Sequence, residues 1–229
     1  DKDYSGSCMK VRRDSDDAEQ DIGFDTNGDV DSSAIATHCG SANGFVVTWY
    51  DQSGNSNNAT QSTAGTQPKI YDGSAVITEN GKPAVRTVGQ AQFMNFSTIN
   101  IAAAGGYATF CAKGSQTDWG SPMTSGAFIR SANQVRMYAG NTQLYNVSNF
   151  SVDFLDRFVL TARKDARDYD IYADTTSVDS RTLTADYTGV FTQIFKGKSN
   201  DTNSVPDNCF LHEVIVYASA LSDTDVASI

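Results

Sequence analysis

Residues 45–55 read FVVTWYDQSGN, an apolar, β-branched and aromatic run that ends abruptly in a polar cluster. Such a run is typical of a β-strand, and the polar cluster is typical of the turn that stops one. We expect Asp51 and Ser53 to hydrogen-bond to their own backbone and Gly54 to take a positive φ. We therefore interpret the cluster as a structural turn rather than a catalytic or metal-binding loop, and Trp49 as part of the core.

Short runs of the same kind recur along the rest of the chain. They lie at residues 9–12, 69–71, 84–85, 93–96, 107–112, 127–130, 134–139, 143–145, 157–162, 168–173, 190–195 and 210–217. Two stretches look helical: residues 34–38, preceded by the capping candidates 31–33, and residues 226–229, preceded by a capping-box-like Ser222 to Asp225. Many short strands separated by turn residues predict an all-β chain, either a sandwich or a barrel.

Length and charge limit the domain organisation and the classes of partner. The 229 residues contain no repeat or linker, so we expect a single domain over residues 1–229, and the helix that stops at Ile229 suggests a piece of a longer protein. Acidic residues outnumber Lys and Arg by 27 to 17, which argues against a nucleic-acid partner. No apolar run approaches about 18 residues, so we expect no membrane insertion.

Cysteine and histidine are too few and too scattered for a structural zinc site. The four cysteines form no C-x-x-C motif, and the chain has two histidines. We interpret Cys111 and Cys209 as small buried apolar residues. A bond between Cys8 and Cys39 is left open.

A loop at residues 25–31 has the spacing of the first half of a calcium loop. Its oxygen-bearing side chains at alternate positions are Asp25, Asn27, Asp29 and Asp31. The sixth position is Val30 and the twelfth is Ala36, so the loop is not an EF-hand. Calcium, the one cofactor considered, remains an alternative to a polar turn in which Asp31 caps the following helix.

Sugar contact is predicted for the middle of the chain. Asp118 and Trp119 lie in a polar, Gly/Ser-rich loop, and Tyr138, Asn141 and Tyr145 flank a predicted hairpin turn at 140–141. Aromatic faces, amides and carboxylates are the groups that bind sugars. We hypothesise that these five residues form a shallow carbohydrate site. The alternative is that Trp119 packs on its own loop or is covered in an oligomer.

The front and the end of the chain resemble known families. Tyr4-Ser5-Gly6, Val11-Arg12-Arg13 with Ser15-Asp16-Asp17, and the segment from Trp49 to Asn57 resemble the N-terminal part of the catalytic domain of α-L-arabinofuranosidase B and its non-enzymatic relatives in phage and bacterial surface proteins. The 51–57 turn and the tail from Leu211 to Ser222 are also similar to laminin-G-like jelly rolls. The resemblance implies a two-sheet antiparallel jelly-roll sandwich of the concanavalin A type.

The resemblance does not supply a complete set of catalytic residues. A glycosidase needs two carboxyl groups, and the family takes its nucleophilic Glu from a mid-chain strand near an adjacent Cys-Cys pair. This chain has only Glu19, Glu79 and Glu213 and no such cysteine pair, although Asp201 falls near the position of the family's acid. Glu213 is interpreted as a structural hydrogen-bonding residue, with a buried acid as the alternative. No catalytic residue is assigned.

The leading hypothesis is therefore a non-catalytic module on a virion or an extracellular cell surface. It would serve adhesion by binding a glycan or a cell-surface or virion protein, and a homo-oligomer is left open. One alternative is a structural, oligomerising domain of a capsid decoration or fibre. Another is a glycoside hydrolase related to the arabinofuranosidases.

Overall fold

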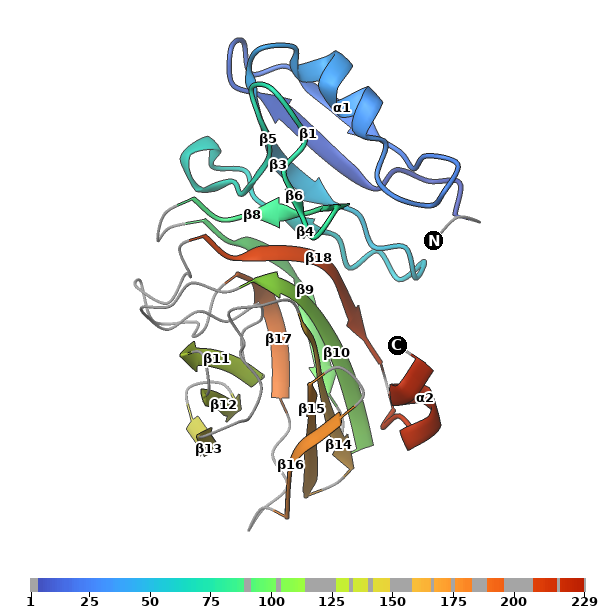
Figure 1. Cartoon of the computed structure of the whole chain (residues 1–229), viewed down its shortest axis with the longest axis vertical. Coiled ribbons are helices and arrows are strands. Elements are labelled where there is room, and N and C mark those ends of the chain that lie inside the picture. Colours follow the sequence, from blue (N-terminus) through green and yellow to red (C-terminus); the bar gives the residue numbers. More distant parts are fainter. Residues whose placement is uncertain are drawn as a thin grey trace.

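The computed structural model describes residues 4–88, 92–101, 104–113, 127–131, 134–139, 142–148, 158–165, 167–173, 176–182, 189–195, 208–217 and 219–228. Within these residues the chain is built from antiparallel strands and two short helices, α1 (Ser32–Cys39) and α2 (Asp223–Ser228) (Figure 1). The expected all-β sandwich with short helices is confirmed. No helix in the described part is long and apolar enough to cross a membrane.

Every expected run overlaps one of the strands. Their bounds are β1 Met9–Arg13, β2 Glu19–Ile22, β3 Asn43–Trp49, β4 Ala59–Thr60, β5 Lys69–Asp72, β6 Thr78–Glu79, β7 Lys82–Pro83, β8 Val85–Arg86, β9 Met94–Ile101, β10 Ala104–Lys113, β11 Ala127–Ser131, β12 Gln134–Ala139, β13 Thr142–Ser148, β14 Phe158–Asp165, β15 Asp168–Ala173, β16 Thr176–Thr182, β17 Gly189–Ile194 and β18 Phe210–Val216. Of these strands, β2, β4, β6, β7 and β16 were not expected. A short 3₁₀ turn, η1, covers Ala64–Thr66.

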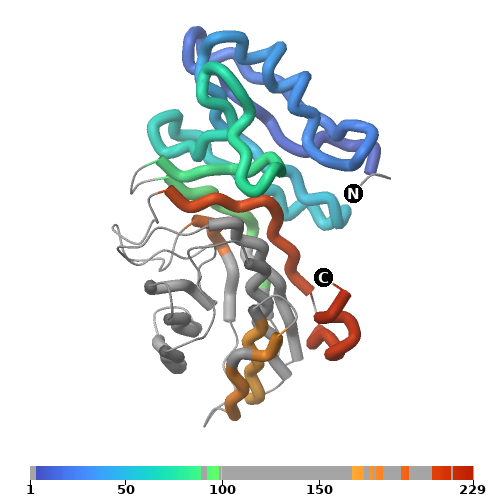
Figure 2. The backbone as a smooth tube through the Cα atoms, viewed as in Figure 1, coloured from blue at the N-terminus to red at the C-terminus, as the bar shows by residue number. Residues whose placement is uncertain are grey.

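Strands from both ends of the chain pair in one long sheet. Among the described residues its order is β16-β15-β14-β10-β18-β8-β5-β3-β4-β9-β17, with β1 joined to β3 and β2 to β1. β18 therefore lies between β8 and β10, so the red C-terminal strand runs beside green segments from the first half of the chain (Figure 2). β11-β12-β13 and β6-β7 form separate small sheets.

One hydrophobic core cluster joins residues that are far apart in the sequence. It includes Val11 and Val46 from the N-terminal strands, Ile35 from α1 and Leu211 from β18, each fully buried. The prediction of a single domain stays a prediction, because this cluster alone does not set domain limits. Cys8, Cys39 and Cys209 are buried free thiols, so Cys8 and Cys39 are not bonded.

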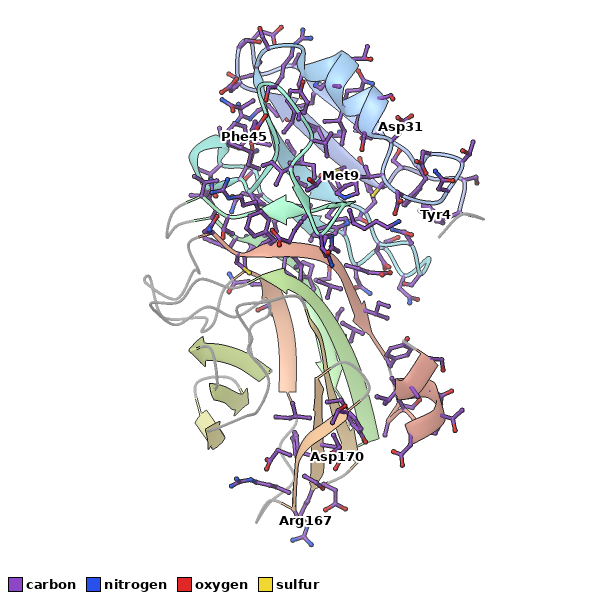
Figure 3. The ribbon with its side chains drawn as sticks, viewed as in Figure 1. Tyr4, Met9, Asp31, Phe45, Arg167 and Asp170 are labelled. Carbon is purple, nitrogen blue, oxygen red and sulfur yellow. The ribbon has the colours of Figure 1, made fainter. Side chains whose placement is uncertain are left out.

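Helix α1 begins and ends with local caps. The Asp31 side chain accepts a hydrogen bond from the Ala34 backbone N–H at 2.9 Å, which fixes the first turn of the helix. Figure 3 labels Asp31 at this end of the helix. The helix ends at Gly40, which takes a φ of 60° and donates its N–H to the Ala36 carbonyl. The predicted capping role of Asp31 is confirmed.

Close packing between α1 and the sheet depends on the missing side chain of Gly44. A Cβ at this position would lie 2.7 Å from Cys39 Sγ and 2.9 Å from Tyr71 Cβ. We expect Gly44→Ala to lower the free energy of unfolding by about 1–3 kcal/mol, since both neighbours are buried and cannot move freely. Urea unfolding would measure the change. Gly23→Ala is the matched control, because its Cβ would meet nothing within 4 Å; equal losses in the two variants would contradict the account.

Candidate active-site cleft

The described residues enclose a cleft of about 730 Å³ between the N-terminal strands and β18. Its wall comes from the start of β1, the loop before α1, the segment that follows β3, the β7–β8 region and β18. Met9, which Figure 3 labels between α1 and β18, contributes to this wall. A cleft of this volume falls within the range of ligand-binding sites in proteins.

The inner part of the cleft is apolar. Met9, Ile70, Val85 and Leu211 line it and are each at most 2% exposed. Trp49 packs against the core, as its sequence context predicts, but it is partly exposed and also lines the cleft. The cleft therefore combines a rigid apolar wall with an aromatic side chain that a ligand can reach.

The turn at Asp51 is a rigid structural element at the rim of the cleft. The Asp51 carboxylate accepts hydrogen bonds from the backbone N–H groups of Ser53 at 2.8 Å and Asn57 at 2.9 Å. Gly54 has a φ of 84°. The predicted structural role of this turn is confirmed. Burial of the carboxyl group opposes ionisation, but the hydrogen bonds outweigh it and lower the pKa of Asp51.

This lowered pKa predicts an acid-dependent loss of stability. The pKa of Asp51 in the folded chain lies below its unfolded value of about 3.9, so the contribution is complete above that value and is lost as the pH falls through the folded pKa. We expect the thermal midpoint of the wild-type chain to fall more between pH 6 and pH 3 than that of Asp51→Asn. Parallel pH profiles of the two proteins would contradict this expectation.

The loop at 25–31 is held by its own side chains and by one ion pair. Asp25 Oδ1 accepts from the backbone N–H groups of Asn27 at 2.8 Å and Asp29 at 3.0 Å. The first of these bonds contributes most to the lowered pKa of Asp25. Asp29 Oδ2 lies 2.7 Å from Lys82 Nζ, which joins the loop to β7. Within the described part, no three His, Cys, Asp or Glu side chains form a metal-binding group; calcium binding at Asp25, Asn27, Asp29 and Asp31 stays a prediction.

Glu213 lies on β18 and lines the cleft with an exposed side chain. Burial is the main reason that the pKa of the Cys8 thiol is raised to about 12. The positive charge of the amino terminus lowers this pKa, and the negative charge of Glu213 raises it further. Glu213 therefore lies within electrostatic range of Cys8, at the wall of the cleft. Its carboxylate makes no hydrogen bond or ion pair with any residue that the structure describes.

The interpretation of Glu213 as a buried acid is wrong, and the described residues give no support to its structural hydrogen-bonding role. The side chain is exposed, so it is not a buried acid, and within the described residues it has no structural hydrogen bond. The signal that could have singled it out is its isolation, since it is one of three Glu in 229 residues and sits in an apolar strand. An unpaired carboxylate at a cleft is available for chemistry.

None of the five predicted sugar-binding residues is among the described residues that line this cleft. Asp118, Trp119 and Asn141 lie outside the described residues. Tyr138 lies in β12 and Tyr145 in β13, where Tyr138 pairs with Gln143 and Tyr145 with Met137. The pairing of Ala139 with Thr142 agrees with the predicted hairpin. The carbohydrate site at these residues stays a prediction.

Comparison with known families decides the class of this protein. Residues 2–117, just over half of the chain, match the family model described as "Alpha-L-arabinofuranosidase B, catalytic". The chain belongs to this arabinofuranosidase catalytic family. A search of curated protein sequences gives no match.

Solved structures agree with the fold. A mutant of a GH54 α-L-arabinofuranosidase, soaked with 4-nitrophenyl α-L-arabinofuranoside, aligns with a TM-score of 0.75 at 17% identity over 100% of this chain and 59% of that one. An arabinofuranosidase complexed with arabinofuranosyl-α-1,2-xylobiose aligns with a TM-score of 0.73 at 18% identity, over 98% and 58% of the two chains. A Trypanosoma rangeli sialidase gives 0.55 at 10% identity, over 80% and 30%. The chain thus spans under two thirds of the arabinofuranosidases it matches, and at these identities the likeness establishes the fold.

The leading functional hypothesis from the sequence is wrong. The matched family is a catalytic one, which favours the glycoside hydrolase alternative over a non-catalytic adhesion module. The expected phage, virion and laminin-G relationships receive no support from these comparisons, whereas the relationship to arabinofuranosidase B is confirmed. The motifs at the front of the chain, which lie within the matched residues, indicate the family, whereas the absent mid-chain Glu does not exclude it.

Proposed function

We propose that this chain is the catalytic part of a glycoside hydrolase that releases arabinofuranosyl units from a glycan. The observation that carries the proposal is the match of residues 2–117 to the arabinofuranosidase B catalytic family. The cleft supports it, because it combines an apolar wall with carboxylates at its rim. A glycan partner and an extracellular place of action follow as part of the same proposal.

Glycoside hydrolysis uses one carboxyl group to protonate the leaving oxygen and another to attack the sugar or to activate water. Three carboxylates line the described cleft: Asp29, Asp51 and Glu213. The Asp51 carboxylate holds the turn through two backbone N–H groups, and Asp29 is paired with Lys82. The Glu213 carboxylate makes no hydrogen bond or ion pair with a described residue, so we assign it as one of the two reacting carboxyl groups.

This assignment departs from the family pattern. No Glu lies between Lys82 and Leu211, where the family's nucleophile would be expected. Glu213 is on β18, and it is the one Glu of the chain that lines the cleft. The proposal therefore requires that a carboxylate of the C-terminal strand acts in hydrolysis.

A direct assay tests the proposal. The purified chain is incubated with 4-nitrophenyl α-L-arabinofuranoside and, separately, with 4-nitrophenyl β-D-xylopyranoside, and released 4-nitrophenol is followed by absorbance. We expect release from the arabinofuranoside well above that from the xylopyranoside. A rate on both substrates equal to the buffer blank would overturn the proposed function.

A further inference from the structure

The charge distribution of the cleft is one-sided. Among its described lining residues, Asp29, Asp51 and Glu213 carry negative charge, whereas Lys82 is the one Lys or Arg. Lys82 is paired with Asp29 at 2.7 Å, and the hydrogen bond with Asp29 raises the pKa of Lys82. The net charge of this pair is close to zero. Among the described lining residues, no further Lys or Arg balances the negative charges of Asp51 and Glu213.

The rest of the lining suits sugar rings and hydroxyl groups. Trp49 and Tyr217 are partly exposed aromatic residues, and Gln52 and Asn55 bring amide groups to the rim. Aromatic faces pack on the C–H surfaces of sugars, and amides both donate to and accept from hydroxyl groups. The volume of about 730 Å³ is in the upper half of the range of ligand pockets, which favours several sugar units over one.

We propose that the cleft selects neutral oligosaccharides over oligosaccharides that carry a uronic acid, and that the Lys82–Asp29 ion pair sets this selectivity. The inference rests on the proposed function in taking this cleft as the substrate site. A uronate carboxylate entering the cleft meets Asp51 and Glu213, and like charges brought together oppose binding. The positive charge of the Lys82 ammonium would offset that repulsion, but it is already balanced by the carboxylate of Asp29, 2.7 Å away.

Two trisaccharides without an arabinofuranosyl bond test the selectivity on the wild-type chain. Xylotriose is neutral, and glucuronosyl-xylobiose has the same number of rings and one carboxylate. Calorimetry at low salt is expected to show xylotriose binding at least about fivefold more tightly. The preference should shrink as sodium chloride is added, because salt screens charges at the exposed rim.

Two variants remove the same ion pair but change the charge in opposite directions. Asp29→Asn leaves Lys82 uncompensated and is expected to reduce the preference for xylotriose by about threefold. Lys82→Gln leaves Asp29 uncompensated and is expected to maintain or increase that preference. If the ion pair only held the loop in place, both variants would change the preference for xylotriose in the same direction.

Several outcomes would overturn the selectivity. They are equal affinity of the wild-type chain for both trisaccharides, no binding of either, or a shift of the same sign in both variants. Hydrolysis is measured separately. A chain that prefers xylotriose but releases no 4-nitrophenol would contradict the proposed function and support the selectivity. A chain that releases 4-nitrophenol but binds both trisaccharides equally would support the proposed function and contradict the selectivity.

Discussion

Glu213→Gln is expected to lower the rate of hydrolysis of 4-nitrophenyl α-L-arabinofuranoside by at least about 100-fold. Glutamine keeps the size of the side chain but can neither take up a proton nor act as a nucleophile, and both roles need a carboxyl group. Glu213 is exposed in the cleft and makes no hydrogen bond with a described residue, so the substitution leaves the fold intact. The measurement is kcat/KM together with the thermal midpoint, which should stay within a few degrees of that of the wild-type chain.

Glu19→Gln is the matched control for this substitution. Glu19 is exposed on β2, does not line the cleft and approaches Lys10 at 3.9 Å, a surface contact of little energetic weight. We expect its activity to equal that of the wild-type chain. If both Glu→Gln variants were as active as the wild-type chain, Glu213 would not be a catalytic residue.

Arg12→Ala is expected to lower the free energy of unfolding by about 2–4 kcal/mol. Arg12 is 8% exposed, its Nε donates to Gln67 Oε1 at 2.8 Å, and its guanidinium lies 5.1 Å from the centre of the Phe45 ring. Phe45 is labelled in Figure 3. Gln67 is 2% exposed, so truncation leaves a buried acceptor without its donor and removes the packing on Phe45.

The ion pair of Arg12 with Asp17 adds little to this figure, since the Asp17 side chain is 77% exposed. Urea unfolding followed by circular dichroism measures the loss. Arg13→Ala is the matched control: Arg13 is the next residue, and its ion pair with Asp16 is solvent-accessible on both sides. We expect a much smaller loss there. A similar loss in both variants would show that the buried contacts of Arg12 do not stabilise the fold.

The strands, helices and turns could be predicted because their signals are local. The run from Phe45 to Tyr50 and the Asp51 turn are specified by neighbouring residues, and the structure reproduces both. Asp31 caps α1 through a contact only three residues away. Such features need no knowledge of the rest of the chain.

The cleft could not be predicted because distant segments build it. Cys8 lies just before β1 and Trp49 at the end of β3, whereas Lys82 comes from the two-residue strand β7 and Glu213 from β18. They meet only because β18 pairs with β8 and β10, at sequence separations of 97 residues or more. Its place in an apolar strand makes Glu213 unusual, but the neighbouring residues do not indicate that it lines a cleft, so the sequence favoured a structural role for it.

The catalytic class could not be predicted from the sequence, because the carboxylate assigned to the reaction also comes from a distant segment. The chain has no mid-chain Glu, but the fold brings Glu213 of β18 to the cleft. A missing motif argues against a particular arrangement of residues, and it does not exclude the reaction. The family match over residues 2–117 carries the correction.

The most direct test of the account is the release of arabinose from arabinofuranosyl-α-1,2-xylobiose by the purified 229-residue chain, followed by chromatography of the products. The account predicts arabinose and xylobiose in equal amounts from the wild-type chain and almost none from Glu213→Gln prepared in the same way. An intact trisaccharide after prolonged incubation with folded wild-type protein would contradict it.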